Sequence, residues 1–169
     1  MNYKRNKKRV MSDHQRLSDL KDILELLYAK LGEFEKELIM NASSSSKFEL
    51  KQKIKREILP NIRRYEKEYW DLYPLEAVTI PEEEAEIKLK QVEQAVTSIE
   101  LVPSTEYPPE IVFLLQDIRS KLEVMDRAAS AKLKLALPLI PAIASYELEM
   151  DTEGLMYKVW NSLKRIVRR

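Results

Sequence analysis

The sequence contains no cysteine, one histidine and two glycines among its 169 residues. Without cysteine it can form no disulfide, no thiol nucleophile and no cysteine-ligated zinc or iron–sulfur centre. The single histidine, His14, excludes a multi-histidine metal site, and two glycines are too few for a glycine-rich phosphate-binding loop. The absence of a Glu-x-x-His motif excludes the di-iron carboxylate type of helix bundle. We therefore expect no catalytic residues, no metal site and no cofactor, and a chain that is not an enzyme.

The residues that are abundant favour helices. Hydrophobic residues make up 44% of the chain and charged residues 34%, whereas glycine, which weakens helices, is almost absent. The apolar stretch over residues 133–143 is too short and too interrupted by proline to span a bilayer, which needs roughly 20 apolar residues. This composition predicts a soluble all-α protein, compatible with the cytoplasm, in which a helical hairpin and two further long helices form a bundle.

The N-terminal segment is strongly basic. Residues 1–11 carry five basic side chains and no acid, and the polar residues 12–16 that follow exclude the apolar core of a signal peptide. We expect a disordered basic arm over residues 1–11. Met11 is an alternative start of the chain, in which case the arm is an upstream extension.

Residues 12–73 have the pattern of a helical hairpin. Apolar residues recur in alternating steps of three and four over residues 17–38, and in steps of three or four over residues 50–72. A short serine-rich segment, residues 42–46, separates the two stripes. Two long amphipathic helices with so short a connection are expected to pack antiparallel.

Two local signals refine the second helix of this hairpin. Ser46 and Glu49 form an S-x-x-E capping box, which predicts the start of the helix. Pro60 lies within the helix, where it removes a backbone donor and clashes with the carbonyl group four residues earlier. We expect one bent helix, with two shorter helices as the alternative.

A second helix pair is predicted over residues 79–132. A T-x-x-E box at residues 79–82 begins the first helix, and the proline-rich segment 103–109 separates it from a second helix over about residues 110–134. Together with the hairpin, this pair is expected to complete a helical bundle over residues 12–132.

Residues 133–169 differ from the rest of the chain in composition. A proline-containing apolar segment, in which strand, hairpin and broken helix all remain open, leads to an amphipathic helix with one apolar and one basic side. Such a helix either docks on a partner or a membrane surface, or closes the bundle with its apolar side. The candidate partner or membrane surface consists of Leu155, Val159, Trp160, Leu163, Lys164, Arg165, Ile166, Arg168 and Arg169.

Charge is segregated along the chain. Residues 47–67 hold eight basic and three acidic side chains, whereas residues 76–100 hold seven glutamates and two lysines. These segments either meet an anionic partner, such as nucleic acid, or pair with each other within the bundle. A sequence pI near 7.8 gives nucleic-acid binding little support. The candidate basic patch consists of Lys51, Lys55, Arg56, Arg63 and Arg64.

Two stretches resemble helical regions of cyanobacterial multidomain proteins. Residues 26–73 resemble helical hairpins that accompany STAND-type NTPases, caspase-like proteases or TIR modules. Residues 134–166 resemble a segment of the same proteins, in which a proline-containing apolar stretch leads through Tyr-Glu-x-Glu-x-Asp-Thr-Glu to an amphipathic helix. The resemblance implies a module that recruits or regulates an effector, and because this chain has no NTPase, protease or TIR segment, the effector would be a separate protein.

Composition, periodicity and resemblance lead to one functional hypothesis. We expect a non-catalytic helical adaptor that associates with a protein partner or with itself through its helices. The first alternative is a peripheral membrane protein anchored through residues 133–169. A further alternative is nucleic-acid binding through residues 47–73 and the basic arm.

Overall fold

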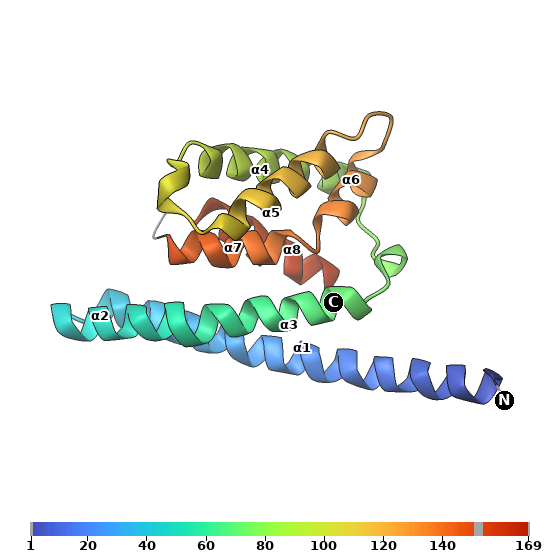
Figure 1. Cartoon of the computed structure of the whole chain (residues 1–169), viewed down its shortest axis with the longest axis horizontal. Helices are drawn as coiled ribbons and strands as arrows, with labels where there is room; N and C mark the ends of the chain where they lie inside the picture. Colours follow the sequence, from blue (N-terminus) through green and yellow to red (C-terminus); the bar gives the residue numbers. More distant parts are fainter. Residues whose placement is uncertain (1, 151–153, 169) are drawn as a thin grey trace. The chain divides into compact units, whose positions relative to one another are not determined.

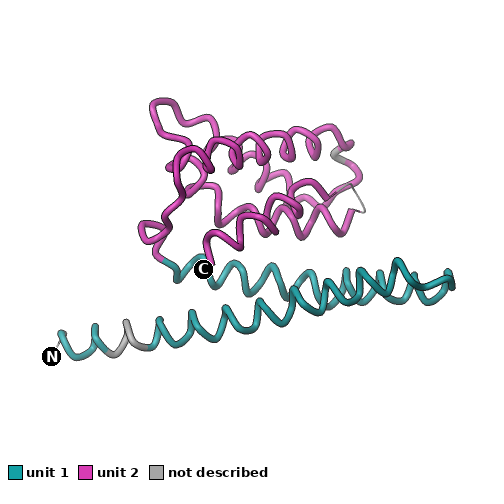
Figure 2. The backbone as a smooth tube through the Cα atoms, turned by 180° about the vertical axis from the view of Figure 1, so that it is seen from behind, with its two compact units in different colours: residues 1–73 teal, residues 74–169 magenta. Residues whose placement is uncertain are grey.

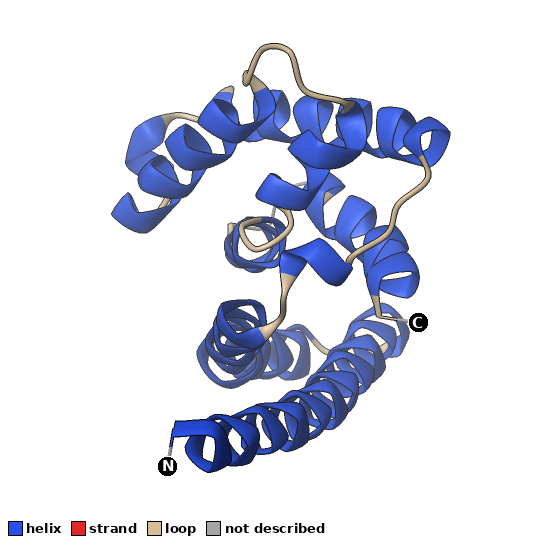
Figure 3. Cartoon of the chain, turned by 90° about the vertical axis from the view of Figure 1, so that its right-hand side faces the viewer, coloured by secondary structure: helices blue, strands red, loops and turns tan. Residues whose placement is uncertain are grey.

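The computed structural model describes residues 2–150 and 154–168, and within these ranges the chain is helical with no β-strand (Figure 3). The predicted all-α class is confirmed. The chain divides into two compact units, Met1–Tyr73 and Pro74–Arg169 (Figure 2). This division differs from the expected bundle over residues 12–132, because the hairpin forms a unit by itself and residues 133–169 belong with the second helix pair.

Unit 1 is an antiparallel helical hairpin (Figure 1). Its first arm buries a stripe of leucines, of which Leu20, Leu24 and Leu31 are almost completely inaccessible to solvent. Its second arm buries isoleucines and aromatic residues over the length that packs against the first. The elements in order are α1 (Asn2–Met40), α2 (Ser44–Lys53), the π-helical turn η1 (Ile54–Ile58) and α3 (Leu59–Leu72).

The starts of helices α1 and α2 both differ from the prediction. Helix α1 begins at Asn2, so the expected disordered arm is helical where the structure describes it. Lysine and arginine are good helix formers, and no glycine or proline interrupts this segment. Helix α2 is capped by Ser43 rather than by Ser46, because the Ser43 hydroxyl accepts a hydrogen bond from the Ser46 backbone N–H.

The expected irregularity at Pro60 takes the form of a π-helical turn. Proline lacks the N–H that would bond to residue 56, and its ring needs space in the preceding turn. The wider turn η1 supplies that space immediately before Pro60, and the backbone at Ile54, Ile58 and Leu59 remains in the right-handed helical region. The second arm is therefore continuous, as expected, with the disturbance absorbed by one turn.

Unit 2 is a cluster of helices around its own apolar core. Helix α4 contacts α5, α6 and α8, while α7 packs against α5 and α8 (Figure 1). The helical spacing of apolar residues predicts one buried face for α4 and one for α5, and both faces are buried. The elements are η2 (Leu75–Ala77), α4 (Glu82–Glu100), η3 (Ser104–Glu106), α5 (Pro109–Leu122), α6 (Ala129–Ala136), α7 (Ile140–Glu149) and α8 (Leu155–Val167).

The helix expected over residues 110–134 is interrupted. Helix α5 ends at Leu122, Asp126 adopts a left-handed backbone with φ of 63°, and α6 begins at Ala129. The segment 133–143 belongs to two helices, so the broken-helix alternative is the one observed. Pro141 is accommodated in the first turn of α7, where its missing N–H needs no partner.

Among the described helices, none combines the length and the apolar character needed to cross a membrane.

The buried stripe of α1 should carry much of the stability of unit 1. Leu24 is 0% exposed and Leu26 is 72% exposed on the same helix. We expect Leu24→Ala to lower the free energy of unfolding by about 2–5 kcal/mol, because it removes buried methyl groups and leaves a cavity. Urea unfolding followed by circular dichroism measures this change. Leu26→Ala is the matched control and should change the stability by no more than about 0.5 kcal/mol; equal effects of the two substitutions would contradict the assignment of the leucine stripe to the core.

Candidate interaction surfaces

A buried carboxylate lies inside the hairpin of unit 1. Glu66 is 1% exposed and accepts hydrogen bonds from the Tyr28 hydroxyl at 2.8 Å and from the Trp70 indole N–H at 3.1 Å. The helical spacing of apolar residues over 50–72 predicts Tyr65 on the buried side of this arm, but Tyr65 is half-buried and Glu66 takes the inward position. Because a buried carboxylate is stable only when it is hydrogen-bonded, Glu66 ties the two arms of the hairpin together.

An ion pair joins the hairpin's arms near its open end. The guanidinium group of Arg16 in α1 donates two hydrogen bonds to the carboxylate of Glu68 in α3, one of them 2.9 Å from Nη2 to Oε2. The Arg16 guanidinium lowers the pKa of Glu68, and the Glu68 carboxylate raises the pKa of Arg16. This bidentate geometry sets the alignment of α1 with α3.

The members of the candidate basic patch lie on the second arm of the hairpin but differ in their surroundings. Lys51 and Arg56 are exposed, whereas Lys55 and Arg63 are half-buried and engaged in other contacts. The Arg64 guanidinium lies over the Tyr65 ring at 4.6 Å and donates to its hydroxyl at 2.7 Å. Several cations of the patch are thus engaged within unit 1, and the exposed Lys51 and Arg56 both precede Pro60.

The C-terminal helix uses its apolar side inside unit 2. Trp160 and Leu163 are 0% exposed, and Val159 is nearly so, because α8 packs on α4 and α7. Arg168 lies over the Trp160 ring at 5.3 Å, so this cation also serves the core. Leu155, Lys164 and Ile166 are half-buried, Arg165 is exposed, and Arg169 lies outside the described residues. The apolar face predicted to dock on a partner or membrane is covered by this unit's own helices.

A second buried carboxylate positions α8. Glu147 of α7 is 2% exposed and accepts hydrogen bonds from the backbone N–H groups of Met156 and Tyr157, at 3.2 and 3.1 Å. These N–H groups belong to the first turn of α8, where backbone N–H groups have no hydrogen-bond partner within their own helix. Gly154, which precedes this turn, has a left-handed backbone conformation. Burial raises the pKa of Glu147, although the two backbone donors favour its ionised form.

A third carboxylate caps α6. Glu82, in the first turn of α4, accepts hydrogen bonds from the backbone N–H groups of Ala129 and Ser130, at 2.6 and 3.2 Å. Hydrogen bonding by Ser130 and Ala129 lowers the pKa of Glu82. Of the three acids that open α4, this one therefore has a structural role within unit 2.

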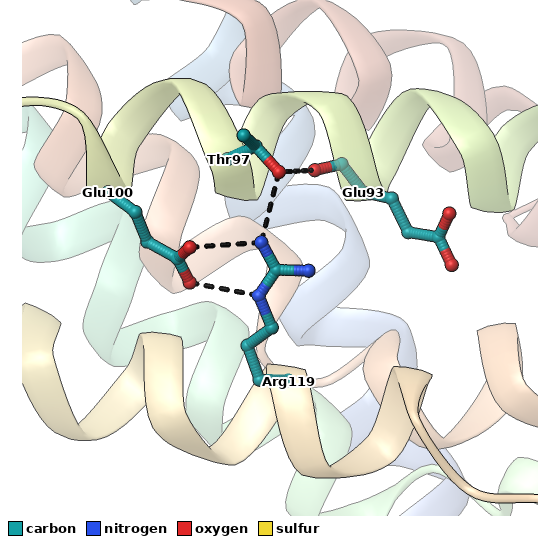
Figure 4. A network of polar contacts seen from close by, with 4 residues as sticks. All are labelled: Glu93, Thr97, Glu100 and Arg119. Atoms are coloured by element: carbon teal, nitrogen blue, oxygen red, sulfur yellow. Dashed lines mark hydrogen bonds and ion pairs between the residues drawn. The ribbon is translucent and has the colours of Figure 1, made fainter.

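An arginine bridges the neighbouring helices α4 and α5 (Figure 4). Arg119 donates two hydrogen bonds to the Glu100 carboxylate, both 2.9 Å long, and one to the Thr97 hydroxyl at 3.0 Å. Thr97 in turn donates to the backbone carbonyl of Glu93. The Glu100 carboxylate raises the pKa of Arg119. Surface depressions of about 400 and 530 Å³ lie beside this bridge. The Arg119 guanidinium is nevertheless paired within unit 2, because the Glu100 carboxylate accepts two of its hydrogen bonds.

Large apolar side chains are exposed at the closed end of the hairpin. Ile39 and Met40, the last residues of α1, are 80% and 83% exposed, and Phe48 in the first turns of α2 is 62% exposed. We call these three residues the hairpin tip. Their positions do not follow the buried seam, so helical periodicity does not mark them as functional residues. The signal that could have identified them is that they are apolar residues outside the seam on either side of a polar loop.

Within residues 2–150 and 154–168, no three His, Cys, Asp or Glu side chains are grouped so that they could hold a metal ion. No protein-family model, no curated protein and no solved structure gives a significant match to this chain.

The buried Glu147 should impose a pH dependence on stability. Because its pKa is raised in the folded protein, the native state keeps the proton to a higher pH than the unfolded chain. The associated stabilisation is complete below the unfolded-state pKa and is lost as the pH rises through the folded-state pKa. Glu147→Gln resembles the protonated carboxyl and does not titrate.

We therefore expect the free energy of unfolding of the native chain, relative to that of Glu147→Gln, to fall as the pH rises above the ordinary glutamate pKa of 4.5. Urea unfolding at several pH values measures this difference, and Glu106→Gln, which changes an exposed carboxylate, is the control. A difference that stays constant or grows with pH would contradict the raised pKa.

Proposed function

We propose that this chain is a non-catalytic helical adaptor that binds a protein partner through the hairpin tip. The observation that carries the proposal is the exposure of Ile39, Met40 and Phe48 within two turns of the same loop. Exposed apolar side chains that gather in one place are a liability for a protein that acts alone and are typical of a binding surface.

The tip is a better candidate than the leucine seam of α1. Leu24 and Leu31 are buried in the hairpin, so a partner helix could reach them only if the hairpin opened. Ile39, Met40 and Phe48 need no such opening. Binding at the tip therefore leaves the packed arms intact, and the hairpin acts as a rigid support for the surface.

The charges around the tip indicate what kind of partner would fit. Lys47 and Lys51 flank Phe48, and their segment of the sequence is basic. A partner with an apolar pocket and an acidic rim would match both features. Such a mode of binding agrees with the role implied by the resemblance to helical regions of multidomain proteins, in which the module recruits or regulates an effector, here a separate protein.

The proposal is tested by cross-linking followed by quantitative binding. Phe48 is replaced by a photoreactive phenylalanine analogue, and a protein that cross-links to it in cells is purified and titrated against the native chain and the I39S/M40S/F48S variant. We expect binding by the variant to be at least about tenfold weaker, because apolar side chains at the centre of an interface carry much of its affinity.

The matched control is L101S/F113S/M125S, which removes three equally exposed apolar side chains from unit 2. Both triple variants should keep the native helical circular dichroism, because the changed side chains are exposed. If the partner binds native, tip and control proteins with the same affinity, the tip is not the binding surface and the proposal is wrong.

A further inference from the structure

The N-terminal turns of α1 extend beyond the end of α3. Arg16 pairs with Glu68, and α3 ends at Leu72, so in an antiparallel pair the last residue of α3 lies beside about residue 12 of α1. The roughly ten residues before that point, about 15 Å of helix, have no second helix of unit 1 beside them. Figures 1 and 2 both show this extension.

The extended part of α1 is cationic and carries one aromatic side chain. Lys4, Arg5 and Lys7 are exposed, and no acid precedes Asp13. Tyr3 is 81% exposed and shares a helix face with Lys7, because residues four apart lie one above the other. We call Tyr3, Lys4, Arg5 and Lys7 the basic overhang.

Unit 2 carries a surface of the opposite charge. Glu83 and Glu86, in the first two turns of α4, are exposed. Ile87, which is 58% exposed, shares a helix face with Glu83. We call these three residues the α4 acidic face. Like the basic overhang, it combines one exposed apolar side chain with charges of a single sign.

We propose that the basic overhang of one copy of this chain packs along the α4 acidic face of a second copy. Tyr3 and Ile87 supply the apolar contact, and the cations of the overhang pair with Glu83 and Glu86. This contact rests on the proposed role in protein association but uses a surface separate from the hairpin tip, so the two can fail independently.

A second copy fits the overhang better than nucleic acid does, because the two units carry opposite charge. Residues 1–73 hold 17 basic and 12 acidic side chains, whereas residues 74–169 hold 12 basic and 16 acidic ones. Two copies therefore attract each other unit to unit, whereas unit 2 repels a polyanion. Since these charges are exposed, salt screens the attraction, and at 0.1 M little of it acts beyond the Debye length of about 10 Å.

Sedimentation velocity of the full chain, treated with nuclease, tests the contact. We expect the native chain to self-associate at low salt and to dissociate at high salt. The K4E/R5E/K7E variant and the E83K/E86K variant should each be monomeric at low salt, because like charges then face each other. An equimolar mixture of the two variants should associate again, because each now offers the charge that the other lacks.

Control variants separate this contact from other causes. K51E/K53E/R56E makes the same change of charge elsewhere in unit 1 and should associate as the native chain does, as should I39S/M40S/F48S. Circular dichroism confirms that each variant is folded. A native chain that is monomeric at low salt, association that survives both reversals, or a mixture that remains monomeric would overturn the contact between copies.

Two further outcomes also overturn it and identify what takes its place. Association that disappears on nuclease treatment assigns the overhang to nucleic acid. Association that is lost only in I39S/M40S/F48S assigns self-association to the tip, in which case the adaptor proposal stands and this contact does not.

Discussion

Antiparallel packing of α1 against α3 is the constraint on which the exposed surfaces of the hairpin depend. The leucine stripe of α1 fills the space against the isoleucines and aromatic residues of the second arm, and so fixes which sides of both helices are hidden. The Arg16–Glu68 pair and the buried Glu66 then set the alignment along the axis. With that alignment, the closed end of the hairpin exposes apolar side chains, and at the open end the cationic first turns of α1 extend beyond the end of α3.

In unit 2, carboxylates from other helices, rather than local capping residues, accept hydrogen bonds from the first turns of α6 and α8. A helix begins with backbone N–H groups that have no partner in their own helix, and these groups attract negative charge. Glu147 supplies such a partner to α8, and Glu82 supplies one to α6. The Glu82 contact joins residues of two helices that lie 47 apart in the sequence, whereas the Glu147 contact joins the consecutive helices α7 and α8. They thereby bind the proline-broken C-terminal segment into the same core as α4.

Charged side chains that are engaged within their own unit are not available to bind a partner. The C-terminal helix has the composition of a membrane-binding helix, yet its tryptophan and leucine lie in the core and one of its arginines covers that tryptophan. The Arg119 bridge is likewise matched by Glu100. The proposed contacts use side chains that the two cores do not: the hairpin tip, the turns of α1 beyond α3, and the exposed acids of α4.

The sequence by itself determined the helical class, the two stripes of the hairpin and the buried faces of α4 and α5. These features follow from the helical spacing of apolar residues along the sequence. The spacing predicts a buried face whichever neighbouring helix covers it. The irregularity at Pro60 was also predictable, because it arises from the chemistry of one residue. Its form as a π turn was not, because the turn depends on how the flanking isoleucines are held against α1.

Only the tertiary structure decided which residues share a core. Glu66 rather than Tyr65 is buried between the arms, because the Tyr28 hydroxyl and the Trp70 indole N–H donate hydrogen bonds to its carboxylate. Periodicity carries no information about such partners. The break after Leu122 and the burial of α8 likewise depend on contacts between distant segments. An amphipathic helix shows that it must cover its apolar face, but the packing of the other helices decides whether its own chain or a partner covers it.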